Sequence, residues 1–200
     1  MPLIAVLDAC VIVPASLRDT LFRTASAKYY RMCFTEDILD EVGRTLINKL
    51  GASAEQAENL LRSIRKSFDD SIISSHRPHV STMPVNEKDK HVLAAAVASN
   101  AQVIVTQNMK DFPETSLAPY GIEAQSPDDF LISLFHDNPR EMCGIVKAQA
   151  NALKNPPLSL SEVLHRLSSH TPRFSGLVQE ELINMGELAL VGSGSTTADE

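Results

Sequence analysis

The fold is decided by the stretch from Asn86 to Phe112, which reads NEKDKHVLAAAVASNAQVIVTQNMKDF. A period of 3.6 residues predicts a helix from Asn86 to about Asn100 and puts Asp89 in the middle of its apolar face, among Val92, Leu93, Ala96 and Val97. A buried carboxylate is costly unless a cation, hydrogen bonds or a metal ion compensate it. Asp89 is therefore either a functional acid or a first-turn acid that interacts with the helix dipole.

A short apolar run follows this helix and ends in polar residues. Residues 103–105, VIV, are typical of a strand covered on both faces, as in a parallel sheet. Thr106, Asn108 and Asp111 come next, at the carboxyl end of the strand, where open α/β sheets bind ligands. Residues 3–7, LIAVL, show the same pattern and end at Asp8. Asp111 has a second interpretation as a loop acid before a proline.

The remaining segments predict an α/β fold with a central parallel sheet. A helix is expected from Pro14, a strand at 32–34, and a helix at 36–50 that Thr35 caps. Glu41 lies on the rim of the apolar stripe of that last helix, from which it can reach an interior cleft, whereas Asp40 points away. Taken alone, Glu41 would be interpreted as a solvated helix glutamate. Further helices are expected after Ser53 and Ser126, with an edge strand at 122–124 between them.

The chain divides into three parts by its pattern. Residues 1–138 carry the α/β pattern, residues 139–190 predict a helical extension of three segments, and residues 191–200 are small, polar and acidic, which predicts a disordered tail.

Three widely spaced cysteines indicate neither a disulfide framework nor a zinc site, so a reducing cytoplasm fits best. No apolar stretch is long enough to span a bilayer, and we expect no membrane association.

The charge of the chain is uneven. Of 18 Lys and Arg and 25 Asp and Glu, the first hundred residues hold 12 of each, so the whole excess of acid lies in the second hundred, for a formal charge of -7. Such acidity disfavours binding of nucleic acid by bulk charge, because phosphate affinity comes from Lys and Arg. A nucleic-acid substrate would need metal ions or a local basic patch, for which the candidates are Arg18, Arg23, Lys28 and Arg31, or Arg62, Arg65 and Lys66.

Four acids and an amide converge in this arrangement on one edge of the sheet: Asp8, Glu41, Asp89, Asp111 and Asn108. The negative charges in such a cluster repel one another unless cations neutralise them. Hard oxygen ligands in this number suit Mg²⁺ or Mn²⁺. A metal pair at such a site activates water and stabilises the attacking and leaving oxygens of a phosphodiester.

Four segments, VLDACVIVPA, ILDEV, DKHVLAAAVA and VIVTQNMKDF, resemble in this order the PIN-domain nucleases, particularly VapC-type toxins of type II toxin-antitoxin systems. The resemblance covers about residues 3–135. It implies a three-layer α/β/α domain and an endoribonuclease dependent on Mg²⁺ or Mn²⁺. The acidic quartet falls on Asp8, Glu41, Asp89 and the pair Asn108 and Asp111, with Thr106 in support. The implied partners are a transfer or ribosomal RNA substrate and a cognate antitoxin.

The chain departs from the family pattern at two places. Many members have Thr or Ser directly after the first Asp, where this chain has Ala9 and then Cys10, and Asn108 stands where other members have Asp. The extension resembles that of longer VapC-like proteins, and antitoxin docking and homodimer formation both stay open as its role. A catalytically weak or inactive PIN fold that binds RNA or protein is the alternative function. The two functions differ in one structural feature: an active nuclease requires the carboxylates of Asp8, Glu41 and Asp89 to lie close together, and an inactive fold does not.

Overall fold

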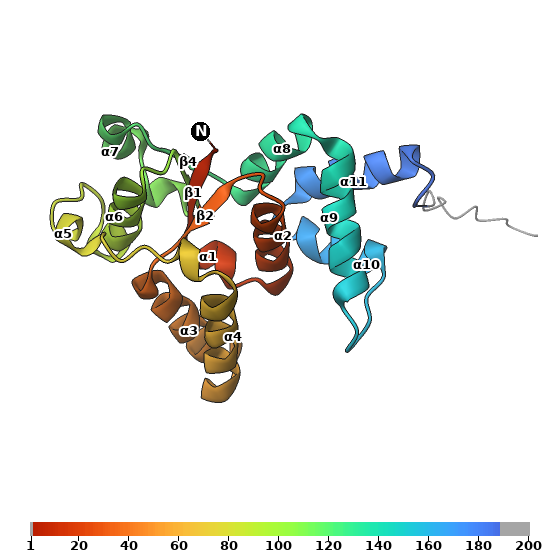
Figure 1. Cartoon of the computed structure of the whole chain (residues 1–200), viewed down its shortest axis with the longest axis horizontal. Coiled ribbons are helices and arrows are strands. Elements are labelled where there is room, and N and C mark those ends of the chain that lie inside the picture. Colours follow the sequence, from red (N-terminus) through yellow and green to blue (C-terminus); the bar gives the residue numbers. More distant parts are fainter. Residues whose placement is uncertain (1, 189–200) are drawn as a thin grey trace, which may run out of the picture.

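A four-stranded parallel sheet lies at the centre of the computed structural model, which describes residues 2–188 (Figure 1). Its strands are β1 (Ile4–Leu7), β2 (Arg31–Cys33), β3 (Val103–Val105) and β4 (Glu123–Gln125), in the order β2-β1-β3-β4. Strands β1 and β3 are neighbours, with Leu7 opposite Val105. The residues that follow these two strands, Asp8 and Thr106, therefore lie side by side at the carboxyl edge of the sheet.

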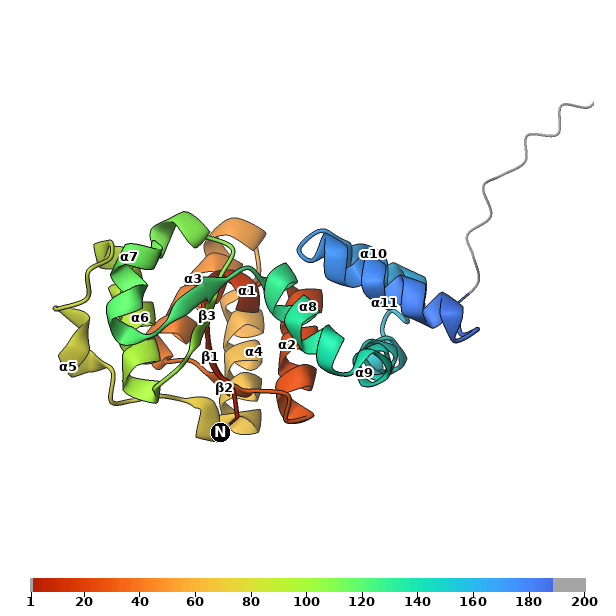
Figure 2. The same cartoon turned by 90° about the horizontal axis from the view of Figure 1, so that it is seen from above.

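Helices cover both faces of the sheet, which gives three layers. Helix α6 (Lys90–Ser99) packs on one face, and α2 (Ala15–Ser26) and α8 (Pro127–Asp137) lie on the other, as the two views show (Figures 1 and 2). Because both faces are covered, every residue of β1 and β3 is buried. This confirms the predicted α/β class and the three-layer architecture, with a parallel sheet at its centre.

The helical hairpin after β2 also forms as the sequence predicts. It consists of α3 (Glu36–Leu50) and α4 (Ala54–Ser67). Thr35 Oγ1 accepts a hydrogen bond from Ile38 N at 3.2 Å, and Gly51 ends α3 in the left-handed conformation at φ 69°. Ser53 and Gln56 form a reciprocal capping box at the start of α4.

The structure differs from the sequence prediction at the short elements. The helix expected from Asn86 begins as a 3-10 turn, η2 (Glu87–Asp89), and α6 starts only at Lys90, so Asp89 precedes the first full turn. Single-turn helices too short to show a period were not predicted: α1 (Ala9–Ile12), α5 (Arg77–Val80), α7 (Glu114–Leu117), η1 (Asp69–Ser71), η3 (Met109–Asp111) and η4 (Ala118–Tyr120).

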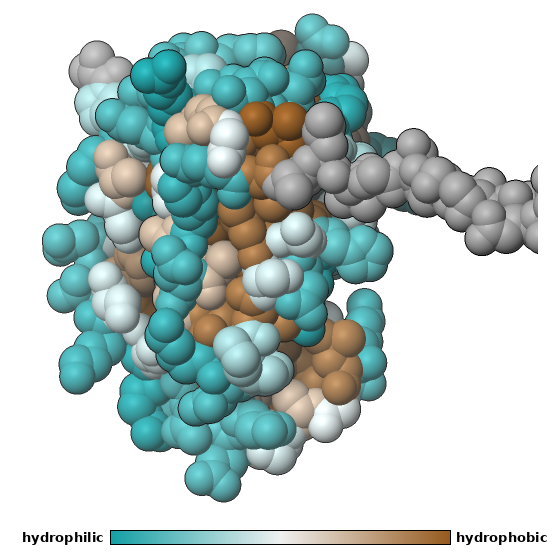
Figure 3. Space-filling model, turned by 90° about the vertical axis from the view of Figure 1, so that its right-hand side faces the viewer, coloured by the Kyte–Doolittle hydropathy of each residue, from teal (hydrophilic) through white to brown (hydrophobic). Residues whose placement is uncertain are grey.

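Three helices follow α8, close to the expected positions. They are α9 (Pro139–Ala152), α10 (Leu160–Ser168) and α11 (Pro172–Asn184). Helix α9 packs against α2 and α8, and α11 packs against α8. Figure 3 looks onto the end of the molecule that these helices form and shows a band of apolar surface between hydrophilic borders.

The predicted disordered tail at 191–200 lies outside the described residues. No helix within residues 2–188 has the length and apolar character needed to cross a membrane.

Buried polar contacts tie the C-terminal helices to the α/β layers. Gln149 of α9 is buried; it accepts a hydrogen bond from Thr20 Oγ1 at 2.6 Å and donates to the carbonyl oxygen of Ser16 at 2.9 Å, both on α2. Asp128 of α8 accepts a hydrogen bond from Phe174 N at 2.8 Å in the first turn of α11. Apolar side chains of α9, α10 and α11 join the same continuous core as the sheet.

We predict that Gln149→Met and Thr20→Val each lower the free energy of unfolding by about 1–3 kcal/mol, because Gln149→Met removes two hydrogen bonds and Thr20→Val leaves the buried Gln149 Oε1 without its donor. The double variant should lose less free energy of unfolding than the two single variants lose together, since it removes both members of the hydrogen-bonded pair. Urea denaturation followed by circular dichroism measures all four proteins. Strictly additive losses would contradict the proposed coupling between α2 and α9.

Candidate active site

Asp8 is the most buried of the four predicted site acids. Its side chain is buried, and its backbone N donates to Val105 O at 3.1 Å, which fixes it beside β3. Thr106 Oγ1 donates to Asp8 Oδ2 at 2.7 Å, and the Cys10 thiol donates to the same oxygen at 3.1 Å. The hydroxyl that the family pattern places directly after this Asp is thus replaced by two donors, one from α1 and one from the end of β3. Thr106 thus contacts Asp8 directly, and its supporting role stays a prediction.

Cys10 is held as a neutral thiol in this site. Its sulfur accepts a hydrogen bond from Gln107 N at 3.2 Å, in addition to its contact with Asp8. Burial, together with the charge of Asp8, raises the pKa of Cys10 to about 12. The side chain therefore acts here as a hydrogen-bond donor to the carboxylate and not as a thiolate nucleophile.

Asp89 and Asp111 meet through a lysine. Lys88 Nζ lies 2.9 Å from Asp111 Oδ2 and 3.6 Å from Asp89 Oδ2. The side chain of Asp89 is 13% exposed and makes no capping hydrogen bond to α6, and its Oδ2 is a buried oxygen without a hydrogen-bond partner within residues 2–188. Burial raises the pKa of Asp89, and the charges of Asp111 and Asp8 raise it further against the opposing effect of Lys88. Asp8, Asp89 and Asp111 therefore interact electrostatically.

Glu41 faces a histidine at the edge of this group. It extends from the middle of α3, and its Oε2 lies 3.5 Å from His91 Nε2 on α6. The interaction with His91 holds the pKa of Glu41 below its ordinary value. Burial lowers the pKa of His91, but Glu41, with help from Asp37 and Asp8, outweighs that effect and raises it. Glu41 thus lies on the side of α3 that faces α6, while Asp40 is exposed.

A second acid of α3 is paired in the same way one turn earlier. Asp37 Oδ2 lies 2.6 Å from Nε2 of the buried His76, which precedes α5. The hydrogen bond from His76 lowers the pKa of Asp37 despite some burial. His76 therefore attaches the segment before α5 to the acidic face of α3, and His91 attaches α6 to it.

The arrangement within residues 2–188 does not bring three His, Cys, Asp or Glu side chains into a set that could hold a metal ion as they stand. Lys88 and His91 neutralise the outer acids instead. The donor chemistry still fits a divalent cation, because Asp89 Oδ2 is buried without a partner and the neighbouring donors are carboxylate oxygens. Asn108 is exposed; its backbone N donates to Thr106 Oγ1 at 3.0 Å. The assignment of metal ligands to Asp8, Glu41, Asp89, Asn108 and Asp111 stays a prediction.

Three residues of this site were missed by the sequence analysis: Cys10, Lys88 and His91. Lys88 and His91 lie on either side of Asp89 in the segment KDKHV. Basic residues so close to an acid on an apolar helix face indicate partners for its charge. The role of Cys10 was not readable, because only the short helix α1 turns its sulfur back toward Asp8.

Two family models match the chain. The PIN domain model matches residues 5–110, which is just over half of the chain, and the model of the VapC50 C-terminal domain matches residues 127–180. The chain therefore belongs to the PIN-domain family. The second model starts at the first residue of α8, whereas the sequence pattern puts the boundary after that helix, between residues 138 and 139.

A relative with this domain is known from Mycobacterium tuberculosis (strain ATCC 25618 / H37Rv). The chain is 38% identical over 96 residues to its "Putative ribonuclease VapC50", and the match covers 48% of this chain and 57% of that protein. The chain thus matches little more than half the length of this relative. A solved structure of VapBC-1 from nontypeable Haemophilus influenzae is similar at a TM-score of 0.46 and 15% identity, over 62% of this chain and 98% of that one.

We predict that Asp37→Asn lowers the free energy of unfolding by about 0.5 kcal/mol near neutral pH, a value discounted because the Asp37 side chain is 40% exposed. A carboxyl whose pKa is lowered by folding stabilises the protein above its unfolded pKa, and this contribution disappears as the pH falls through the folded pKa. The difference from the wild type should therefore shrink below about pH 4.

The measurement is urea denaturation at a series of pH values, with Asp40→Asn as the matched control on the exposed side of the same helix. A difference that grows as the pH falls would contradict this interpretation of the pair formed by Asp37 and His76.

Proposed function

We propose that this protein is a metal-dependent endoribonuclease that hydrolyses RNA phosphodiester bonds, and that it acts as the toxin of a toxin-antitoxin pair. The observation that carries the proposal is a pair of acids at the carboxyl edge of the sheet. Asp8 is buried and fixed by hydrogen bonds from Thr106 and Cys10, and the half-buried Asp89 has one oxygen without a hydrogen bond in the described chain. Like-charged carboxylates in a partly desolvated site cost stability even where hydrogen bonds compensate some of the charge, so a functional reason is the better explanation.

The chain's own residues have distinct roles in this proposal. Asp8, Asp89 and Asp111 would hold a divalent cation, with Glu41 and Asn108 completing the set from α3 and from the loop after β3. When bound, Mg²⁺ or Mn²⁺ supplies positive charge opposite the phosphodiester and makes water a stronger nucleophile. Thr106 and Cys10 hold Asp8 in one orientation by donating to its Oδ2. Lys88 keeps Asp89 and Asp111 from repelling each other.

The proposal extends to partners and organisation. Transfer or ribosomal RNA is the proposed substrate, a cognate antitoxin the neutralising partner, and the cytoplasm the place of action. The name of the M. tuberculosis relative, "Putative ribonuclease VapC50", supports an RNA substrate over the part of the chain that it matches. We further propose residues 1–138 as the nuclease domain and residues 139–190 as a helical extension whose role is antitoxin docking or homodimer formation.

One observation favours a second candidate function, a PIN fold without activity that binds RNA or protein. The ammonium group of Lys88 contacts two of the acids and His91 contacts a third, so charge is neutralised without a metal ion. In an inactive module such pairs would be permanent. The two functions differ in whether a divalent cation competes with Lys88 for Asp89 and Asp111.

Substitution of the two buried acids tests the proposed activity. Asp8→Asn and Asp89→Asn should each lower metal-dependent cleavage of RNA at least about a hundredfold, because each removes a charge proposed to hold the cation. Both should also relieve growth arrest on expression. Cleavage is followed on purified transfer and ribosomal RNA by sequencing of the new ends, with Asp40→Asn as control. Unchanged cleavage by both variants would rule out the mechanism.

Thermal unfolding tests the metal site without any cleavage. Saturating Mg²⁺ or Mn²⁺ should raise the Tm of the wild-type protein by about 2–6 °C, because a ligand that binds only the folded state stabilises it. The rise should be absent in Asp89→Asn and kept in Asp40→Asn. If the wild type shows no shift, or Asp89→Asn shifts equally, the metal site is wrong and the inactive PIN fold becomes the better explanation.

A further inference from the structure

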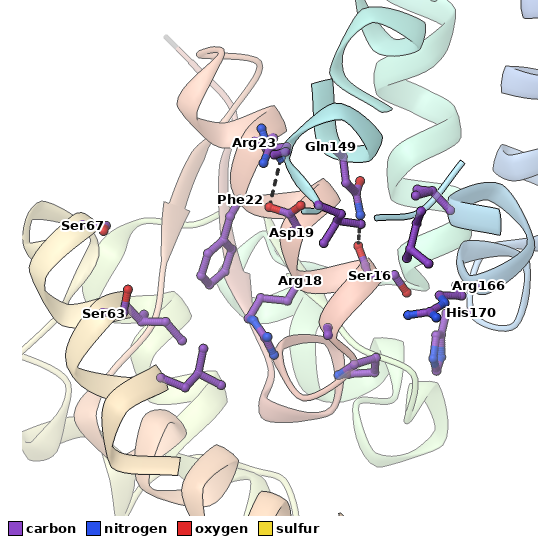
Figure 4. Close-up of a pocket in the computed structure, with 18 of the residues that line it drawn as sticks. Ser16, Arg18, Asp19, Phe22, Arg23, Ser63, Ser67, Gln149, Arg166 and His170 are labelled. Atoms are coloured by element: carbon purple, nitrogen blue, oxygen red, sulfur yellow. Dashed lines mark hydrogen bonds and ion pairs between the residues drawn. The ribbon is translucent and has the colours of Figure 1, made fainter. Parts of the chain in front are cut away.

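A groove of about 660 Å³ runs between the α/β layers and the C-terminal helices. One wall comes from α2 and α4, with Phe22 and Ile64, and the other from α9, α10 and the loop that follows α10, with Val163. Figure 4 shows Arg18 and Phe22 on α2 between the helix that carries Ser63 and Ser67 and the helices that carry Gln149 and Arg166. The groove is thus shared by the PIN layers and the extension.

The groove carries positive charge without matching acids. Its charged residues are Arg18, Asp19, Arg23 and Arg166, together with His170, and Asp19 is used by Arg23 in an ion pair at 3.0 Å. Among the described residues neither Arg18 nor Arg166 has a carboxylate within ion-pair distance. Most other arginines singled out as candidate basic patches are neutralised: Arg62 and Arg65 pair with Glu58 and Glu36.

Arg18 is the more unusual of the two free arginines. It is partly buried, and its Nη1 donates to the carbonyl oxygens of Ile12 at 2.8 Å and Val13 at 3.1 Å, at the end of α1. These two bonds fix the guanidinium, while no hydrogen bond uses its Nε or Nη2 within residues 2–188. A guanidinium held in one orientation with free donors is suited to bind phosphate oxygens.

The groove is connected to the candidate active site through one residue. Gln107 directly follows Thr106; its backbone N donates to Cys10 Sγ, and its side-chain Nε2 lies 2.9 Å from His170 Nδ1. With Gln107 as donor, Nδ1 of His170 accepts and the ring proton is on Nε2, which makes that nitrogen a second donor. The extension therefore contacts the loop that follows β3, next to the buried acids.

We propose that this groove binds the phosphate backbone of single-stranded RNA, with Arg18, Arg166 and His170 contacting phosphates on the way to the candidate active site. The proposal deepens the function proposed above and rests on it. It gives the extension a direct part in holding the substrate. In a chain with a formal charge of -7, affinity for RNA requires such a local concentration of unpaired cations.

An acidic protein segment is the other class of ligand that these charges would attract. The contact between His170 and the loop after β3 favours RNA, because it places the basic wall of the groove beside the residues proposed to cleave a phosphodiester. The apolar lining, with Phe22 and Phe68, is compatible with bases of a single strand, which bind to grooves that combine positive charge with aromatic surface.

The test is binding of a short fluorescent single-stranded RNA to the full chain, measured by anisotropy in EDTA so that no cleavage takes place. Arg166→Gln and His170→Ala should each weaken binding about three- to tenfold, and Arg166→Gln should reduce the slope of log affinity against log salt by about 0.7, the value for one lost phosphate contact. Arg18→Lys should lose less RNA affinity than Arg18→Gln, because lysine keeps the positive charge although it lacks the planar guanidinium donors.

Arg140→Gln is the matched control, since Arg140 is exposed on α9, outside the groove and without an ion-pair partner in the described part of the chain. It should bind RNA as the wild type does. Equal affinities of Arg166→Gln, His170→Ala and the wild type would overturn the inference, as would an equal loss in Arg140→Gln. Displacement of the RNA by oligoglutamate at matched charge would also overturn it in favour of an acidic protein ligand.

This measurement is independent of the proposed activity. If the wild type cleaves RNA but the groove variants bind normally, only the groove assignment is wrong. If the wild type binds RNA through the groove but never cleaves it with Mg²⁺ or Mn²⁺, the nuclease function is wrong and the groove remains an RNA site of an inactive PIN fold.

Discussion

The buried carboxylate of Asp8 is the constraint on which the rest of the structure depends. Two parallel strands that pair side by side must end side by side, so β1 delivers Asp8 next to the end of β3. A carboxylate at that depth needs donors, and Thr106 from β3 and Cys10 from α1 supply them. The single turn of α1 is what returns Cys10 to the acid that precedes it. The local structure after both strands is therefore explained by one buried charge.

The remaining acids show how such a site stays folded. Asp89 and Asp111 are held against Lys88, and Glu41 and Asp37 against His91 and His76. Every outer acid thus has a partner that is either a flexible ammonium or an imidazole. Lys88 is easily displaced, because an exposed lysine loses little when it exchanges a carboxylate for water, whereas His76 is buried against Asp37. Asp89 Oδ2 is buried and has no hydrogen bond within residues 2–188, where its compensation is the ion pair with Lys88 at 3.6 Å.

Most of the fold was predictable from the sequence because its long elements have clear periods and caps. The stripe of α3, the capping box of α4 and the apolar runs of β1 and β3 each specify one element, and the parallel sheet follows from strands buried on both faces. The single-turn helices carry no period, so α1, α5 and the start of α6 could not be placed. For the same reason the contact of Cys10 with Asp8 was found only in three dimensions.

The C-terminal helices are held by apolar packing and by buried polar contacts, and not by pairs of charges. They join the same core as the sheet, and Gln149 and Asp128 are buried polar contacts that fix their orientation and not only their attachment. A helix attached by apolar packing alone could slide, whereas these contacts fix where the loop after α10 lies. That loop carries His170, and its position against Gln107 depends on a fixed α9 and α11. The extension is thus placed precisely enough to form one wall of a site, which an appendage on a flexible linker could not do.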